Sequence, residues 1–214
     1  MTPTRRSNPA PARPTRKVGR AQLRGDRTRD AIIGETVRCI NEEGSAAASA
    51  NHIAERAGVT WGVIQYHFGD RNGLLSAVIA DGFRHFRRAI ESVPLPDGTT
   101  RQRVEAVVEA AWEAFSSPES RASFEILISA RLGRDRARVD ELEGMARDMR
   151  RLSGVLVGER VDFGDNNVVV GEVLWATLRG LVMAQMVASR TIDSSREREL
   201  LVDLITGLLD GVPA

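Results

Sequence analysis

Apolar residues recur every three or four positions along most of the chain, which is the period of an amphipathic α-helix. The first stripe starts near residue 28, runs through Ile33, Val37 and Ile40, and ends at Gly44. Later helices are predicted over residues 70–92, 100–116, 118–132, 136–161, 166–190 and 194–211. Residues 168–170 have strand character, but the segment is too short to change the class. The pattern therefore predicts an all-α protein.

Between the first stripe and residue 70, the pattern predicts two short helices that are separated by a tight turn. Ser49 can cap the first helix, and Gly58 can take the left-handed conformation that ends it. Thr60 follows at once and can cap the second helix, on which Ile64 and Phe68 share an apolar face. Two helices joined by so short a turn must cross steeply, as in a helix-turn-helix.

The rest of the second helix carries aromatic, amide and imidazole groups without a run of charge. Such a surface suits the DNA major groove, where a Gln amide can pair with adenine and apolar atoms can meet the thymine methyl group. Glycine at position 62 would allow close approach of the backbone. The candidates for this outward surface are Trp61, Gly62, Val63, Gln65, Tyr66 and His67.

The run Ile53–Thr60, the Tyr66-His67-Phe68 triplet, Asp70-Arg71 and Leu74-Leu75 resembles the TetR family of bacterial transcriptional regulators. The resemblance covers roughly residues 28–80. It implies an N-terminal three-helix helix-turn-helix DNA-binding head on a larger helical body that binds a ligand and dimerises. No enzymatic activity is implied.

The resemblance also implies roles in DNA binding. Trp61, Val63, Gln65 and Tyr66 are the base-edge candidates, and Asn51 on the preceding helix is a further one. Thr60, His67 and Arg71 are similar to phosphate-positioning residues. The chain has Gln65 where the family often has an aromatic residue, and Trp61 where it often has a polar or basic one, so the operator sequence cannot be borrowed from a relative.

The patterns predict a disordered basic tail over residues 1–27, a head over 28–75 and a helical body over 76–214. The resemblance implies that the head is a DNA-binding domain and the body an effector-binding and dimerisation domain. The tail is either a solvated leader or an arm that adds phosphate or minor-groove contacts. Residues 1–90 carry 15 Arg and Lys against 8 Asp and Glu, whereas the rest of the chain carries 15 against 21. A basic head on an acidic body is typical of a nucleic-acid-binding head on a non-binding body.

Composition excludes several other classes of protein. We find no apolar run that approaches membrane-spanning length and no secretory signal, so a cytoplasmic protein without a membrane partner is expected. The single Cys39 is interpreted as a small buried apolar residue. His52, His67 and His85 have no cysteine or paired carboxylate at ligand intervals, so no metal is expected. No cofactor loop and no nucleophile-base pair is found, which argues against an enzyme.

The last two predicted helices indicate self-association. Small residues recur four apart at Ala176, Gly180, Ala184 and Ala188, and a broad leucine stripe runs from Leu200 to Leu209. These surfaces either fill an internal core or pack on their own copies in a homodimer, and the resemblance implies the second.

Large apolar side chains of the middle helices either fill the core of the body or line a site for a small apolar effector. They are Phe86, Trp112, Phe115, Phe124, Met145, Met149 and Trp175, with Glu125, His85 and Gln185 as possible orienting polar groups. The leading hypothesis is a ligand-responsive dimeric repressor that a small apolar effector releases from a palindromic operator in double-stranded DNA. The alternative is an effector-independent DNA-binding or architectural protein whose body only dimerises.

Overall fold

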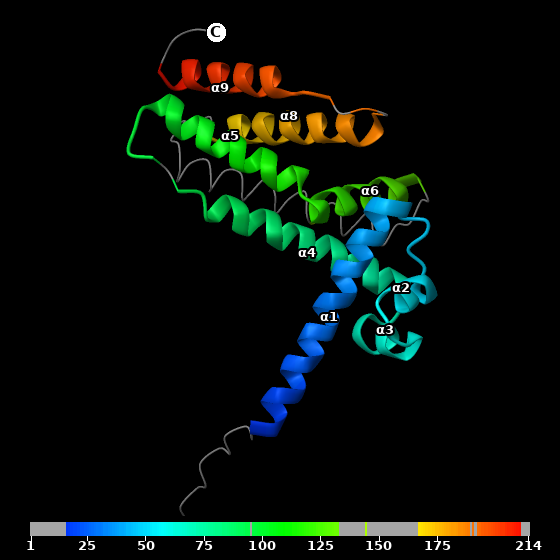
Figure 1. Ribbon diagram of the computed structural model, residues 1–214. Coiled ribbons are helices and arrows are strands. Elements are labelled where there is room, and N and C mark those ends of the chain that lie inside the picture. The colour runs from blue at the N-terminus through cyan, green and yellow to red at the C-terminus, as the bar shows by residue number, and fades with distance from the viewer. Residues whose placement is uncertain are drawn as a thin grey trace, which may run out of the picture.

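The computed structural model describes residues 16–94, 96–132, 144, 167–188, 190 and 192–210. Within these ranges the regular elements are helices, as predicted (Figure 1). They are α1 (Arg16–Glu43), α2 (Ala50–Arg56), α3 (Trp61–Phe68), α4 (Arg71–Glu91), α5 (Thr100–Ser116), α6 (Pro118–Leu132), α8 (Asn167–Val187) and α9 (Ser195–Leu209). Apart from residue 144, the predicted helix over 136–161, with Met145 and Met149, lies outside the described residues.

The first three helices pack on the start of α4 to form a small N-terminal unit, the head. Ile33, Ile53, Ile64 and Leu74, one from each of the four helices, are almost completely buried in a single apolar cluster. Gly58 has a φ of 64°, in the left-handed region, so the turn between α2 and α3 has the conformation expected there.

Two helices of the head are capped by side-chain hydrogen bonds, α2 at the predicted cap Ser49 and α4 at Asp70. Ser49 Oγ accepts a bond of 3.2 Å from the His52 amide, and Asp70 Oδ1 accepts one of 2.8 Å from the Gly73 amide. Thr60 occupies the cap position of α3, but its side chain makes no capping hydrogen bond. The predicted role of the Thr60 hydroxyl as a cap is therefore wrong, although the predicted helix start is right.

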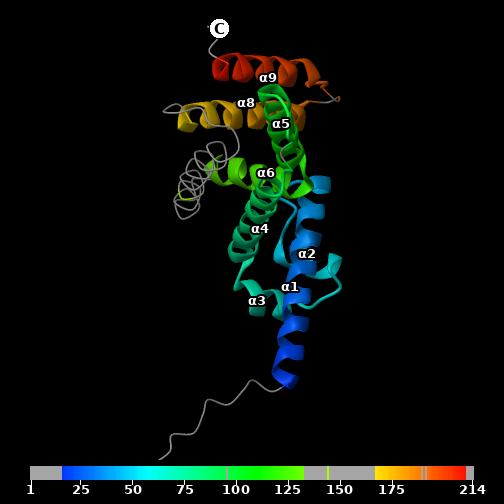
Figure 2. The ribbon, with the colours of Figure 1, turned by 90° about the vertical axis from the view of Figure 1, so that its left-hand side faces the viewer.

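Helix α1 begins at Arg16, twelve residues before the predicted start near residue 28. Residues 16–27 are therefore helical, and the prediction of a disordered tail is wrong for them. Pro14 is the last proline before this segment, so nothing after it breaks the hydrogen-bond pattern, and residues such as Ala21 and Leu23 favour a helix. In both ribbon views this first part of α1 extends past α3, away from the body (Figures 1 and 2).

Helix α4 connects the head to the body. Leu74 and Val78 lie in the head cluster, whereas Phe86 and Ile90, farther along the same helix, lie in a second cluster with residues from α5, α8 and α9. Helix α6 also packs on the head, because Ile126 joins the head cluster. The two cores thus share one continuous helix.

Helix α8 contradicts the expectation that no apolar run of the chain approaches membrane-spanning length. The segment Val169–Val187 is long and apolar enough to cross a membrane by length and composition alone. Leu174, Leu178 and Val182 of this helix are buried in the body core. The core helix of a soluble protein passes the same test, so this finding is weak evidence for a membrane span.

Candidate DNA-binding interface

Helix α3 has one face in the head core and the opposite face in solvent. Ile64 is fully buried, and Val63 and Phe68 pack against the same cluster. Tyr66 is 84% exposed and Trp61 is 39% exposed, although both are large apolar side chains. Gly62 and Gln65 are exposed beside them. Two aromatic rings that are left in water on one short helix indicate a surface that is covered by a partner.

The predicted base-edge residues therefore separate into two groups. Trp61, Gln65 and Tyr66 project from the exposed face of α3, and Asn51 is exposed on α2. Val63 is half-buried against the head core, which leaves less of its side chain to meet a base.

His67 and Thr60 lie at the edges of this surface. The ring of His67 is half-buried between two aromatic neighbours, with ring centroids 5.0 Å from Tyr66 and 6.0 Å from Phe68. It also faces α1, because a Cβ built on Gly25 would lie 3.9 Å from His67 Cε1. Thr60 is exposed at the N-terminus of α3.

Arg71 has a structural role that the sequence did not reveal. Its Nε donates a hydrogen bond of 2.8 Å to the Ala48 carbonyl oxygen, and its Nη2 donates one of 2.7 Å to the Ser45 carbonyl oxygen. The guanidinium, predicted to bind phosphate, therefore holds the segment between α1 and α2 against the start of α4. Arg29 also has a contact within the protein, because its guanidinium lies 5.3 Å from the Phe68 ring centroid.

Helices α1 and α2 are joined by an ion-pair network around Arg56. Its Nε lies 2.7 Å from Glu35 Oε1, its Nη2 lies 2.7 Å from Glu42 Oε2, and its Nη1 pairs with Glu43. Hydrogen bonds from Arg38 and Arg56 hold the pKa of Glu35 below its ordinary value. The same acidic partners, Glu42 first, raise the pKa of Arg56. The acidic residues of α1 are spaced for one helix face, but only the packing of α2 brings Arg56 to them.

The fold also corrects the interpretation of His52. The ring of this residue lies beside Cys39 and Glu43 of α1, and the three donor atoms are all within 4.8 Å of one another. The prediction that His52 has no cysteine or carboxylate at ligand spacing holds along the chain but fails in space.

In the body, most of the predicted effector residues pack against one another. Phe115 is nearly fully buried, and its ring centroid lies 4.5 Å from that of Phe86, 5.8 Å from Phe124 and 5.7 Å from Trp175. Trp112 is half-buried, and the guanidinium of Arg198 lies over it, 4.5 Å from the centroid of the Trp112 ring. These contacts favour the core-filling alternative for the aromatic residues.

A groove of 550 Å³ lies between α4 and α5. Of the predicted effector residues it includes Phe86, and of the predicted orienting groups it includes His85. Glu109 and Glu113 of α5 lie on its opposite wall. The other two orienting groups are engaged elsewhere: Glu125 accepts a hydrogen bond from the Ser45 amide, and Gln185 donates one of 2.9 Å to the Ile192 carbonyl oxygen.

Together, the buried support of α3, its exposed aromatic face and the left-handed turn before it define a helix-turn-helix DNA-binding head on a helical body. Comparison with known proteins agrees with this class. The family model described as bacterial regulatory proteins, tetR family, matches residues 32–78. The N-terminal part of the chain is thus similar to regulatory proteins of the TetR family.

Curated relatives match the N-terminal part of the chain. The HTH-type transcriptional regulator BetI of Escherichia coli O17:K52:H18 (strain UMN026 / ExPEC) is 36% identical over 99 residues, which are 45% of this chain and 49% of that protein. BetI of Klebsiella pneumoniae (strain 342) is 39% identical over 94 residues, 43% of this chain and 46% of that protein. The match thus spans about half the length of these relatives.

Solved structures resemble the whole fold. A bacterial regulatory protein in the tetR family from Rhodococcus RHA1 has a TM-score of 0.62 at 14% identity, over 85% of this chain and 96% of that one. The multidrug binding protein EbrR, solved in complex with imidazole, has a TM-score of 0.59 at 22% identity, over 82% and 88%. At these identities the likeness establishes the fold alone.

Proposed function

We propose that this protein is a dimeric transcriptional regulator that places α3 in the major groove of DNA. The observation that carries the proposal is the exposed face of α3, with Trp61, Gln65 and Tyr66 presented by a helix whose other face is fixed in the head core. A rigid helix of this kind fits the width of the major groove, and its side chains reach base edges there. A partner of this type implies a cytoplasmic location.

The first part of α1 extends the basic surface of the head. Arg24 and Arg27 are exposed on the segment that runs past α3. Arginine side chains there would add contacts to phosphates beside the groove that α3 occupies. This supports the arm rather than the solvated-leader interpretation of these residues.

The proposal of a dimer is supported by apolar surface on α8 and α9. Ala176, Gly180 and Ala184 are exposed along α8, and Leu200, Leu204 and Leu208 are exposed along α9. Exposure of a continuous apolar stripe to water is unfavourable, whereas contact with the same stripe on a second copy would bury it. A two-fold dimer presents two copies of α3, which matches a palindromic operator.

We propose that the effector binds in the groove between α4 and α5 and not among the aromatic residues of the body core. Phe86 and Ala89 supply an apolar wall, and Glu109 and Glu113 supply polar groups. A ligand that binds one position of α4 better than another would shift the head, because α4 is shared by both cores. Such a ligand would release the repressor from its operator.

One observation favours the second candidate function, a DNA-binding protein whose body only dimerises. The rings of Phe86, Phe115 and Trp175 fill the body core against one another, and they need no ligand to bury their surfaces. The two candidates differ in whether any small molecule weakens DNA binding.

The test is a selection of bound sequences from a random DNA pool with the full chain. We expect a palindromic motif, because each copy of α3 would read one half-site. Recovery of sequences without any shared motif would contradict the proposal. Repeating the binding measurement across a panel of small molecules then separates the effector-responsive form from the effector-independent one, since an effector lowers DNA affinity and raises the melting temperature of the free protein.

A further inference from the structure

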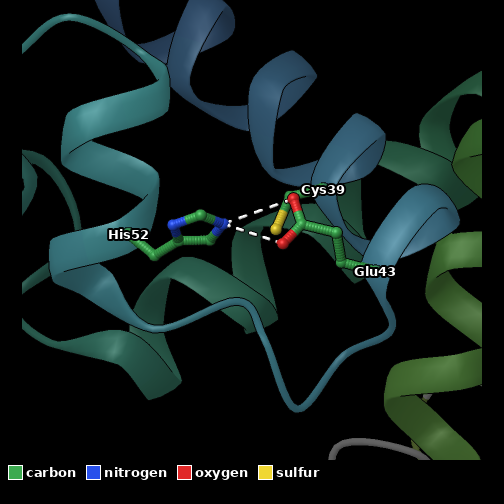
Figure 3. A group of neighbouring side chains, drawn as sticks. All are labelled: Cys39, Glu43 and His52. Atoms are coloured by element: carbon green, nitrogen blue, oxygen red, sulfur yellow. Dashed lines mark hydrogen bonds and ion pairs between the residues drawn. The ribbon is translucent and has the colours of Figure 1, made fainter.

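Three side chains of different donor chemistry meet where α1 and α2 pack together in the head. Cys39 and Glu43 lie one helical turn apart on α1, and His52 reaches toward them from α2. Figure 3 shows the imidazole pointing its Nε2 at the carboxylate of Glu43, with the sulfur of Cys39 beside it. The Cys39 sulfur, a Glu43 carboxylate oxygen and a His52 ring nitrogen all lie within 4.8 Å of one another.

The imidazole and the carboxylate are already held face to face. His52 Nε2 lies 3.0 Å from Glu43 Oε2 and 3.3 Å from Glu43 Oε1. The His52 main chain is fixed at the start of α2, where its amide donates to the Ser49 hydroxyl. Two donor groups from different helices are therefore already close together, which lowers the conformational entropy cost of binding an ion.

The Glu43 carboxylate is also oriented from its other side. Its Oε1 accepts a hydrogen bond from Arg56 Nη1, and Arg56 is in turn paired with Glu35 and Glu42. Carboxylates and imidazoles that bind metals are commonly positioned by outer partners of this kind. Oε1 is shared between Arg56 and His52, whereas Oε2 is the carboxylate oxygen nearer to His52.

The site is buried on the side of Cys39 and open to solvent on the side of His52 and Glu43. Cys39 is fully buried in the head cluster, while the side chains of His52 and Glu43 are 36% and 38% exposed. An ion could enter from solvent, and a water could complete its coordination on that side. Three protein ligands with one open position are a common arrangement for zinc.

The donor types decide the class of ion. Sulfur, imidazole nitrogen and carboxylate oxygen together suit a borderline ion such as Zn²⁺ or Co²⁺, whereas Ca²⁺ and Mg²⁺ prefer oxygen ligands only. Zinc bonds of about 2.0 to 2.3 Å place tetrahedral donors about 3.5 Å apart, so separations of up to 4.8 Å must close by up to about 1.3 Å. The side chains of Glu43 and His52, each more than a third exposed, would make this change by rotation.

We propose that Cys39, Glu43 and His52 form a binding site for a divalent ion of the zinc class. Because two ligands belong to α1 and one to α2, the bound ion fastens the first helix of the head to the helix-turn-helix. Without the ion, the same groups form a histidine-carboxylate pair beside a buried thiol.

The experiment is a titration of the full-length protein with Co²⁺, followed by displacement with Zn²⁺. Thiolate coordination produces a charge-transfer absorption band, and Cys39 is the single cysteine of the chain, so the band would identify it as a ligand. We expect the band to appear, to saturate at one ion per chain, and to disappear when Zn²⁺ replaces Co²⁺. A protein that shows no such band at saturating Co²⁺ would overturn the proposal.

Matched variants test the other two ligands. Glu43→Gln should lower Zn²⁺ affinity, measured calorimetrically, by at least roughly 10 to 100-fold, the loss found when even an outer partner of a metal site is removed. Glu55→Gln is its control, because Glu55 is an exposed carboxylate on the neighbouring helix α2 and is not among the three donors. Equal affinities in these two variants would contradict the assignment of Glu43.

His52→Gln and His85→Gln form the second matched pair, since both histidines are at least partly exposed and only His52 belongs to the cluster. The first should weaken binding and the second should not. A Cys39→Ser variant could fail to fold because Cys39 is buried in the head core, whereas both histidines are at least partly exposed and can be replaced without disturbing the core. Equal loss of Zn²⁺ binding in both histidine variants would overturn the site.

Discussion

Arg71 and Ala48 are joined by a hydrogen bond of 2.8 Å from the arginine Nε to the alanine carbonyl oxygen. The bond crosses from the first residue of α4 to the segment before α2, and a second bond from the same guanidinium reaches the Ser45 carbonyl oxygen. Both acceptors are main-chain carbonyl groups of the segment between α1 and α2. The arginine therefore sets the position of α2, and through it the turn to α3.

Replacement of this arginine separates its structural role from the predicted phosphate contact. Arg71→Ala should lower the free energy of unfolding by about 1.5 to 3 kcal/mol, the usual range for a hydrogen bond from a charged group. Thermal or urea unfolding measures this. If Arg71 also binds phosphate, the DNA affinity of the variant should become less salt-dependent by about one contact. An unchanged stability would contradict the structural role, and an unchanged salt slope would contradict the phosphate contact.

Gln65 is the most specific candidate for base reading. It is exposed on α3 beside the buried Ile64, and its amide offers a donor and an acceptor side by side. Gln65→Ala should lose about 1 to 3 kcal/mol of affinity for the best site and relax the preference at one symmetric pair of positions, as expected for a lost pair with adenine. A random-pool selection with the variant checks this. The same motif from variant and parent would show that Gln65 does not read a base.

Gly180 tests the association of α8 with a second copy. A Cβ built at this position meets no atom within 4 Å, so Gly180→Arg should leave the fold of one chain intact. Placed in the exposed small-residue stripe, the new side chain should shift the protein toward monomer at micromolar concentration. Sedimentation equilibrium measures the shift. A dimer of undiminished strength would place the interface elsewhere.

Gly82 is the matched control for that substitution, because it is a helix glycine in a closed environment. A Cβ at Gly82 would lie 2.4 Å from Ser123 Oγ and 2.8 Å from the Glu119 carbonyl oxygen of α6. Gly82→Ala should therefore lower the melting temperature, whereas Gly180→Arg should not. Equal melting temperatures would mean that α4 and α6 can separate without loss of stability.

Glu35 should make the stability of the head depend on pH under acid conditions. The pKa of Glu35 lies below its ordinary value of 4.5 because it accepts hydrogen bonds from Arg38 and Arg56. A carboxyl group whose pKa is depressed on folding stabilises the protein above the unfolded value, and this contribution is lost as pH falls through the folded value.

Melting temperatures measured from neutral pH downward should therefore fall below about pH 4.5, and Glu35→Gln should flatten part of that fall. Glu199→Gln, an exposed carboxyl group on α9, provides the control. Curves of the same shape for parent, Glu35→Gln and Glu199→Gln would show that the pairing of Glu35 with Arg56 does not contribute to stability.

Local features of the chain were enough to predict the helical class and the head. The cap at Ser49, the left-handed Gly58 and the apolar spacing of Ile53, Ile64 and Phe68 depend on neighbours within a few residues, and the structure confirms them. The exposed face of α3 follows from the same spacing. The stripe on α8 was also visible in the sequence, because small residues four apart share a helix face wherever the helix packs.

Composition predicts a disordered tail over residues 1–27, but α1 begins at Arg16, and no proline between Pro14 and the end of α1 interrupts its hydrogen bonds. The partners of Arg71 and of the aromatic residues could not be predicted, for a different reason. A side chain such as Arg71 or Phe115 chooses its partner from segments far along the chain, and sequence spacing carries no record of that choice.

The cluster of Cys39, Glu43 and His52 shows the limit most clearly. The four-residue spacing of Cys39 and Glu43 on one helix is readable from the sequence, and so is a second helix that begins near His52. Whether that helix turns His52 toward α1 depends on how α2 packs on the head core and on where the Arg56 network holds it. Periodicity determines which face a residue shares, but only the packing of one face on another decides which residues meet.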